Sequence, residues 1–233
     1  MWDNAPLLRG IANALFGVSL VLVLYGGVRY VLRLPVFPLR AVELTVAPQR
    51  VSSEQLEKVV HEQVSGNFFT VDLENTRQAF EKLPWVRKVS VRRKFPWSLE
   101  VEVEEQVALA HWNGKELVNT HGEVFAGKVD EDIPAFIGQP DSSMQVTQLY
   151  GELNAALQPL KQQIVQISLS PRYAWQVKLD NGMVLELGRD EMQLRLKRFV
   201  AVYPYSLAAL ARPVSHVDLR YRNGFAAQIA GNV

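Results

Sequence analysis

Apolar and polar positions alternate strictly in two neighbouring segments on either side of a proline-containing turn. Residues 88–92 alternate valine with basic or small polar residues, and residues 99–104 alternate leucine or valine with glutamate. A period of two places alternate side chains on opposite sides of a strand, so this pattern predicts an antiparallel hairpin with one buried face. The exposed face sets a basic strand against an acidic one, and each opposed pair contributes about 0.2–1 kcal/mol. These charges indicate first a solvated sheet face of fixed register, and only second a binding surface.

The segments before this hairpin predict one strand and two helices. Residues 42–46 alternate apolar with polar side chains. Ser52 and Gln55 have the spacing of a capping box, which marks the start of a helix. Asp72 is placed to cap a second helix, which a proline ends before the hairpin begins. The predicted order β-α-α-β-β covers residues 39–107.

The second half of the chain has a different pattern. Short apolar runs are separated by Asn-Gly and His-Gly pairs, which mark tight turns. We expect a second domain over residues 108–233, mainly antiparallel β with two helices, so that the chain as a whole is α+β. Its strands are expected at 109–112, 117–120, 124–126, 164–169, 174–179, 183–187, 216–221 and 225–229, and its helices at 144–157 and 191–203, the latter capped by Asp190.

An uncharged apolar run lies near the N-terminus. Residues 10–28 carry no charge and, as a helix, extend about 28 Å, close to the roughly 30 Å of a bilayer core. Trp2, Tyr25 and Tyr30 lie near its ends, where aromatic side chains anchor a span at the membrane surface. We therefore expect a tail at 1–9, a single transmembrane helix at 10–32 and a linker at 33–38.

Two features of this span leave alternatives open. Gly26 and Gly27 are preceded by Leu24 and Tyr25, which makes a poor small-x-small cleavage site, so an anchor is favoured over a signal peptide. Four of the 25 basic and one of the 24 acidic residues lie before residue 41, which leaves a nearly neutral remainder of 21 and 23. The basic residues after the span outnumber those before it, so a positive-inside count favours a cytoplasmic main domain.

The sequence contains little that indicates catalysis. It has no cysteine, which excludes disulfides, thiolate metal sites and cysteine nucleophiles. No nucleophile elbow, phosphate-binding loop or dinucleotide fingerprint is present, and His61 has no second histidine at zinc-protease spacing. The acidic residues 130–132 lack the central glycine of a calcium loop, and a formal charge of +1 gives no basic field for nucleic acid. We expect no enzyme activity, cofactor, metal or nucleic-acid ligand.

The hairpin region also resembles a known family. It is similar to the end of a POTRA domain, most closely that of the FtsQ/DivIB family, although Ala108 stands where the family usually has proline. The similarity resumes in the second half and spans most of the chain from Leu34 onward. The residues that carry it are 83–86, Val89, Val91, Arg93, Pro96, 99–101, Glu105, Trp175, Gln176, 199–204 and 217–221.

The last predicted hairpin, residues 217–229, has no later segment to cover its outer strand. That strand, residues 225–229, contains neither charge nor proline, the features with which proteins usually protect an exposed edge. We hypothesise that another protein adds a strand there. Tyr221 would be an aromatic anchor, and Arg220 and Arg222 would pair with acidic side chains of the incoming segment. The alternative, that these are ordinary residues of a sheet face, stays open.

The FtsQ/DivIB resemblance implies a cell-division scaffold without catalysis. It implies a single-pass type II protein of the inner membrane, periplasmic in its bulk and located at the septum, which links upstream division proteins to FtsB and FtsL. FtsK and other division proteins are expected upstream, with a weak recruitment site at Lys88 and Ser90. The expected FtsB/FtsL site combines the carried-over residues with the uncharged strand: Asp218, Leu219, Arg220, Tyr221, Arg222, Asn223, Gly224, Phe225 and Gln228.

Two other classes of function compete with this one. A POTRA module that handles polypeptides in outer-membrane assembly or secretion should be followed by many amphipathic strands of about ten residues. A membrane-tethered periplasmic hydrolase would need a nucleophile and base. The sequence from Ala108 onward instead predicts helices and the turns of a soluble domain, and contains no such catalytic set.

Overall fold

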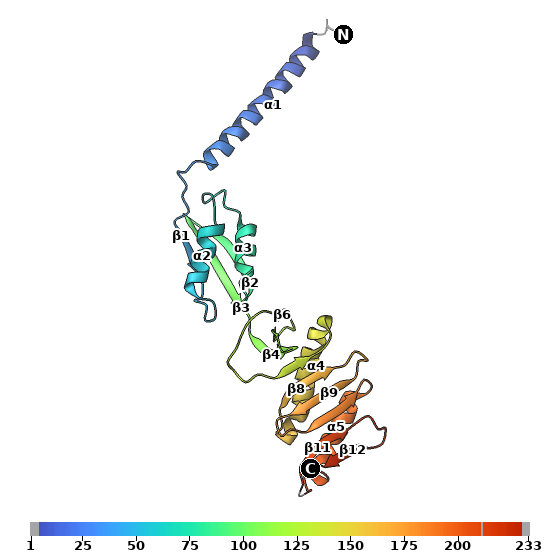
Figure 1. Ribbon diagram of the computed structural model, residues 1–233. Coiled ribbons are helices and arrows are strands. Elements are labelled where there is room, and N and C mark those ends of the chain that lie inside the picture. Colours follow the sequence, from blue (N-terminus) through green and yellow to red (C-terminus); the bar gives the residue numbers. More distant parts are fainter. Residues whose placement is uncertain (1–4, 211, 230–233) are drawn as a thin grey trace. The chain divides into compact units, whose positions relative to one another are not determined.

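The computed structural model describes residues 5–210 and 212–229 (Figure 1). It divides into two compact units, Met1–Glu105 and Gln106–Val233. Trp2, expected as an interface anchor, lies outside the described residues. Helix α1 covers Ala5–Leu32 and therefore begins earlier than the expected residue 10. Pro6 is compatible with this start because a proline in the first helical turn removes only an N–H that has no intrahelical partner.

Helix α1 is long and apolar enough to cross a membrane. Its 28 residues extend about 42 Å, more than the roughly 30 Å of a hydrocarbon core. The most apolar part of the segment from Pro6 to Leu32 is not buried against any other described part of the protein. An apolar helix whose most apolar part is not buried against the rest of the described chain fits a single-pass membrane segment.

The rest of the first unit has the predicted β-α-α-β-β order. In the sheet, β3 lies in the centre, parallel to β1 and antiparallel to β2. A small core centred on Phe80, Val89 and Val101 lies between the sheet and the two helices. The elements are β1 (Ala41–Leu44), α2 (Ser53–Gln63), α3 (Leu73–Glu81), β2 (Val86–Lys94) and β3 (Ser98–Glu105).

Local sequence explains these elements. Ser52 and Gln55 form the predicted capping box at the start of α2, and the Asp72 side chain accepts two backbone N–H groups at the start of α3. The hairpin register sets Arg92 opposite Glu100, and their side chains approach to 3.4 Å. The prediction of a basic strand facing an acidic one is therefore confirmed.

The second unit is built on a single mixed sheet. Within the described residues it has nine strands in the order β12-β11-β10-β9-β8-β7-β4-β5-β6, with three parallel and five antiparallel pairs. A mainly antiparallel α+β domain is thus confirmed. Its elements are β4 (Ala108–Trp112), β5 (Glu116–Asn119), β6 (Val124–Phe125), β7 (Ala135–Ile137), α4 (Ser143–Leu157), β8 (Ile164–Leu169), β9 (Trp175–Leu179), β10 (Val184–Gly188), α5 (Met192–Val202), β11 (Val214–Asp218) and β12 (Ala226–Ile229), with short 3₁₀ turns η1 (Pro140–Ser142), η2 (Gln158–Leu160) and η3 (Tyr203–Tyr205).

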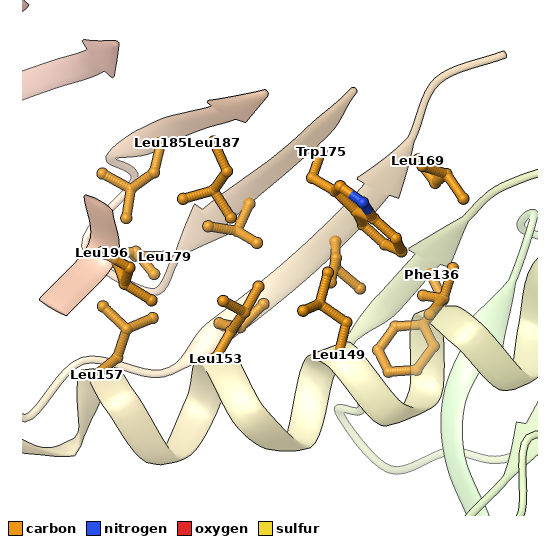
Figure 2. Close-up of a cluster of buried hydrophobic side chains, with 14 of the residues drawn as sticks. Phe136, Leu149, Leu153, Leu157, Leu169, Trp175, Leu179, Leu185, Leu187 and Leu196 are labelled. Carbon is orange, nitrogen blue, oxygen red and sulfur yellow. The ribbon is translucent and has the colours of Figure 1, made fainter. Parts of the chain in front are cut away.

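The core of this unit lies between the sheet and its helices. Leu149, Leu153 and Leu157 repeat on one face of α4 and point at leucines and Trp175 of the strands (Figure 2). Leu196 of α5 joins the same cluster and is fully buried. Both helices therefore share one core with the sheet, whereas β12 contributes no buried side chain.

Two local expectations were wrong, and one strand was not predicted. Glu191, not Asp190, precedes α5, and it has a left-handed backbone with no side-chain cap. Strand β11 ends at Asp218, not at Tyr221, because the Asp218 carboxylate accepts the backbone N–H of Arg220 and the chain turns there. Strand β7 was not predicted, since three residues are too short to show a period of two.

Candidate partner-binding site

Strand β12 is the outermost strand of the nine-stranded sheet. It pairs with β11 in the register Val217 to Ala227 and Asp218 to Ala226, and all four of its residues are exposed. Among the described residues, no strand pairs with its outer side. The outward N–H and C=O groups of β12 are thus placed for pairing with an added strand.

Asp218 and Arg220 form an internal ion pair where β11 ends. The Arg220 guanidinium donates from Nε to Oδ1 at 2.9 Å and from Nη2 to Oδ2 at 2.7 Å, and the Arg220 backbone N–H donates to the same Oδ1. The hydrogen bond from Arg220 lowers the pKa of the Asp218 carboxyl, and the carboxylate in turn raises the pKa of the guanidinium. Arg220 therefore shapes the turn, and an acidic partner side chain would have to share it with Asp218.

The loop between β11 and β12 is held at three points. The buried Leu219 donates its backbone N–H to the Glu186 carbonyl of β10 at 2.9 Å. Arg198 of α5 donates from Nη1 to the Arg222 carbonyl at 2.6 Å. The Phe225 ring packs edge-on against Phe199 of α5, with 5.5 Å between ring centroids. Because these contacts come from β10 and α5, the loop has a fixed position on the unit.

Tyr221 is the most prominent side chain of this loop. It is 57% exposed, whereas Leu219 before it and Phe225 after it are held by contacts with β10 and α5. A shallow hollow of about 370 Å³ lies beside it, lined by residues 221–226. An exposed aromatic side chain on a fixed loop loses little conformational entropy on binding, which is typical of an interface anchor.

The structure brings most of the predicted site residues together. Tyr221, Arg222, Asn223, Gly224 and Phe225 line the hollow, with Ala226 in addition. Asp218 and Leu219 support the loop from inside, and Gln228 lies on β12 opposite His216. The supporting contacts from Glu186, Arg198 and Phe199 were not predicted, because no local pattern places a helix residue next to a loop 24 positions away.

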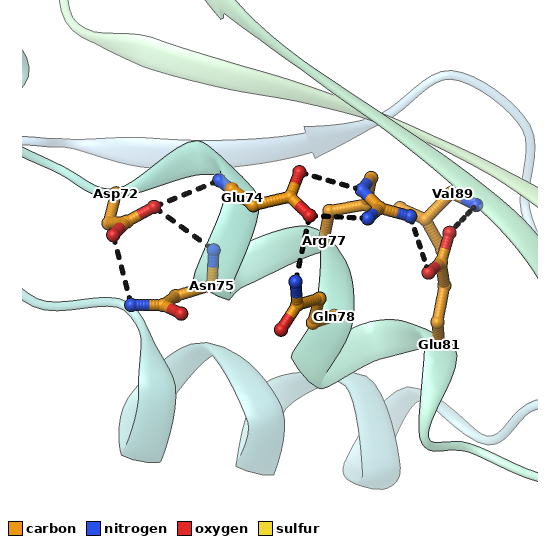
Figure 3. Close-up of polar contacts among 7 residues, drawn as sticks. All are labelled: Asp72, Glu74, Asn75, Arg77, Gln78, Glu81 and Val89. Atoms are coloured by element: carbon orange, nitrogen blue, oxygen red, sulfur yellow. Dashed lines mark hydrogen bonds and ion pairs between the residues drawn. The ribbon is translucent and has the colours of Figure 1, made fainter.

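The second predicted site, Lys88 and Ser90, lies on β2 at the edge of the three-stranded sheet. Both residues are exposed, opposite Glu104 and Glu102 of β3. Between them, the backbone N–H of Val89 donates to the Glu81 carboxylate at 3.2 Å. Arg77 holds that carboxylate at 2.6 Å, as part of the polar row along α3 in Figure 3. One position of this edge therefore already has a hydrogen-bond partner from within the unit.

The described part of the chain contains no group of three or more His, Asp or Glu side chains that could hold a metal ion. His61 and His111 lie in different units, and His121 lies in a turn where it contacts its neighbour Thr120. The carboxylates of β3 lie along one strand and form ion pairs with β2.

An apolar N-terminal helix followed by a POTRA fold and a mainly antiparallel unit defines the class of membrane-anchored POTRA proteins. Residues 37–106 match the family model for the POTRA domain of FtsQ type, and residues 110–220 match that for the C-terminal part of cell division protein FtsQ/DivIB. The chain belongs to the FtsQ/DivIB family of cell division proteins.

Similar proteins agree with this assignment over almost the whole length. The cell division protein FtsQ of Nitrosospira multiformis is 44% identical, with 98% of this chain and 99% of the relative aligned. The proteins of the same name from Bordetella pertussis and Burkholderia pseudomallei are 38% and 37% identical, with 99% of this chain aligned to 93% and 95% of theirs. A role in cell division and a POTRA domain were both predicted from the sequence and are confirmed.

Proposed function

We propose that this chain is a non-catalytic scaffold of the division machinery, anchored in the inner membrane and periplasmic in its bulk. It links upstream division proteins to FtsB and FtsL at the septum. The observation that supports this most is strand β12, which is outermost, exposed, uncharged and free of proline, beside a fixed loop that presents Tyr221. A segment of FtsB or FtsL adds to this edge as a further strand, with backbone hydrogen bonds for affinity and Tyr221 for specificity.

Membrane anchoring supports the scaffold role physically. Partners that are confined to one bilayer meet at a high effective concentration, so contacts of modest affinity hold a complex together. The basic residues Arg29, Arg33 and Arg40 after the apolar run do not oppose a periplasmic domain, because long domains cross the membrane largely regardless of flanking charge.

The decisive experiment compares the intact chain with a chain that ends at Phe225. The shortened chain lacks β12 but keeps the Phe225–Phe199 contact and the Arg198 bond that fix the loop. We expect the intact chain, solubilised from membranes, to retain FtsB and FtsL and the shortened chain to lose both. Circular dichroism and thermal unfolding should stay close to those of the intact chain, because β12 buries none of its side chains.

Each other outcome has a clear meaning. A shortened chain that still retains both proteins would remove the edge of β12 from the site while leaving the scaffold role intact. An intact chain that retains neither protein would contradict the scaffold role itself. The polypeptide-handling alternative would then become the better explanation of the POTRA domain.

The POTRA unit supplies the second proposed contact, through Lys88 and Ser90. Lys88→Glu places an acidic side chain opposite Glu104, where the two like charges repel each other. The new charge would also repel an acidic side chain of a partner protein. We expect a fluorescent fusion with this change to accumulate less at the septum. Lys58→Glu is the matched control, since Lys58 is also exposed but lies on α2. Unchanged septal accumulation of the Lys88 variant would contradict this contact.

A further inference from the structure

An aromatic cluster lies at the end of the POTRA unit where the chain leaves α1. The ring of Phe37, in the linker, stacks on Trp97 at 5.6 Å between centroids and meets Phe69 edge-on at 5.1 Å. Phe68 lies edge-on to both Phe69 and Trp97. Phe95, in the turn between β2 and β3, completes the group at 6.3 Å from Trp97. Five rings from three separate segments thus form one apolar surface, the aromatic end of the POTRA unit.

Only part of this cluster is buried, which is unusual for a structural core. Phe95 is 79% exposed and Phe69 is 41% exposed. Val36, in the linker to α1, is also exposed. A single exposed apolar residue requires no explanation, but a contiguous exposed group marks a surface that meets an apolar partner.

Hydrogen bonds fix this surface beside the last turn of α1. The Asn67 side-chain amide donates to the carbonyls of Leu32 and Leu34 at 2.8 and 3.0 Å. The Phe68 backbone N–H donates to the Phe37 carbonyl at 3.0 Å. Asn67 thereby satisfies carbonyls at the helix end that have no intrahelical partner, and it joins the aromatic loop directly to the anchor.

The loop itself is rigidly built. The Asn67 Oδ1 accepts the backbone N–H groups of Phe69 and Thr70, and the Arg93 guanidinium donates to the carbonyls of Phe68, Phe69 and Val71. These bonds use the polar groups of the loop internally. The carbonyls of Phe68, Phe69 and Val71 beside the rings therefore have hydrogen-bond partners, which lowers the cost of placing this loop in an apolar environment.

We propose that the aromatic end of the POTRA unit inserts into the headgroup region of the bilayer that α1 spans. The occupant is lipid, because this surface is continuous with the end of a membrane-length helix and aromatic side chains are favoured at the membrane interface. Arg33, in the linker, and Arg40, just before β1, supply positive charge for anionic headgroups. This inference rests on the proposed membrane anchoring, and it adds a second, peripheral contact that orients the POTRA unit.

Depth measurement on the full chain tests the proposal directly. Because the chain has no cysteine, single spin labels can be placed at Phe95→Cys, at Val46→Cys and at Val21→Cys in nanodiscs of phosphatidylethanolamine and phosphatidylglycerol. Val46 is the matched control, an apolar POTRA residue that is 63% exposed just after β1. We expect the label at 95 about 5–10 Å inside the headgroup boundary, the label at 21 in the hydrocarbon core and the label at 46 in water.

A second set of variants keeps the Phe95 ring. A label at Phe69→Cys should also lie in the interface, should move into water when Phe95→Asp is added, and should not move when Val46→Asp is added instead. Circular dichroism of each variant checks the fold.

The outcomes separate the two proposals. A lipid-buried label at 21 with labels at 95 and 69 in water would overturn the insertion and leave the anchor intact. A label at 21 in water would overturn the anchor itself. Labels at 95 and 69 that are shielded from both lipid and water only when another division protein is present would assign this surface to a protein partner, and would also overturn the lipid contact.

Discussion

Two strands of this protein lie at the edge of a sheet, but only one of these edges carries charged side chains and a side-chain hydrogen bond that protect it. Both β2 and β12 are outermost strands. Strand β2 carries basic side chains, and the Glu81 carboxylate accepts a hydrogen bond from the backbone N–H of Val89 at its edge. Strand β12 carries no charge, and the side-chain hydrogen bond to its backbone, from Ser215 Oγ to the Gln228 carbonyl, comes from the neighbouring strand β11. Since proteins normally protect an edge against a foreign strand, the unprotected edge is the better candidate for strand addition, and β2 is better suited to side-chain contacts.

Burial sharpens this difference. Val86 and Val89 of β2 belong to the core of the first unit, whereas all residues of β12 are exposed. Burying a valine side chain contributes about 1.5–3 kcal/mol. Strand β2 therefore stabilises its unit, and β12 adds little to the stability of its own. A strand that contributes little to folding is free to be used for binding.

The largest effect is expected on partner affinity at the unprotected edge, from a change at Tyr221. Tyr221→Ala removes the exposed aromatic anchor beside β12, and truncating an interface anchor of this kind typically costs at least about 2 kcal/mol, or roughly 30-fold in affinity. Titration of the full chain with a labelled FtsB periplasmic segment measures this loss. Tyr205→Ala is the matched control, because Tyr205 is 88% exposed but lies in η3. Equal affinities of the two variants would contradict the role of Tyr221.

A smaller effect, on the stability of the POTRA unit, is expected at the protected edge of β2. Glu81→Gln removes the charge that pairs with Arg77 but keeps an oxygen that can accept the Val89 N–H. A hydrogen bond to a charged group contributes about 1.5–3 kcal/mol and one between neutral groups about 0.5–1.5, so the loss should be about 1 kcal/mol. We expect lower stability of the POTRA unit and faster hydrogen exchange of the Val89 amide. Glu74→Gln is the control, since Glu74 also pairs with Arg77 but lies two helical turns before Glu81, the residue that accepts the Val89 N–H. Unchanged exchange at Val89 would show that this carboxylate does not protect the edge.

The smallest effect is expected from the Asp218–Arg220 pair on acidification. The pKa of Asp218 is lowered in the folded chain, from about 3.9 when unfolded. Its contribution to stability is therefore complete above about pH 4 and is lost as the pH falls through the folded pKa. The difference in thermal unfolding between the intact chain and Asp218→Asn should thus be small at pH 7, because water screens the exposed Arg220. It should shrink as the pH falls below 4 and disappear below the folded pKa of Asp218. A difference that grew on acidification would contradict the pair.

The sequence predicted best what depends on neighbouring residues. The capping box at Ser52, the cap at Asp72 and the hairpin register all follow from spacings of a few positions, and all are confirmed. The N-terminus of α5 was misplaced because Glu191 adopts a left-handed conformation that its side chain does not favour. Short β7 forms only because β4 and β8 lie on either side of it.

The candidate site was predictable in part for the same reason. The uncharged, proline-free run at residues 225–229 and the aromatic residue Tyr221 before it can be recognised from the sequence alone. The internal pairing of Arg220 with Asp218 was not, because two basic residues flanking a tyrosine suggested equal availability for a partner. The contacts of Arg198 and Phe199 with the loop depend on how α5 folds back on the sheet, which no local pattern encodes.

The parallel pairing of β1 with β3 has a mechanical consequence. Strand β1 follows the linker from α1, and β3 leads directly into the second unit, so the two ends of the POTRA unit belong to adjacent strands. Tension between the membrane and the second unit pulls these strands past each other, and the bonds from Arg40 to Trp97 and from Thr45 to Val101 must then break together with the ladder between them. The Glu105 carboxylate reinforces this joint by accepting the N–H groups of Gln49, Arg50 and Val51.

Pulling experiments would measure this resistance. Handles attached at Val36→Cys and Val107→Cys load the two strands in shear, whereas handles at Lys88→Cys and Val107→Cys open the β2–β3 hairpin one bond at a time. We expect slower forced unfolding in the first geometry, since it is the unfolding barrier along the pulling direction that sets the rate; equal rates would contradict the inference. We therefore expect the POTRA unit to stay folded when tension acts between its two ends, with its exposed surfaces intact.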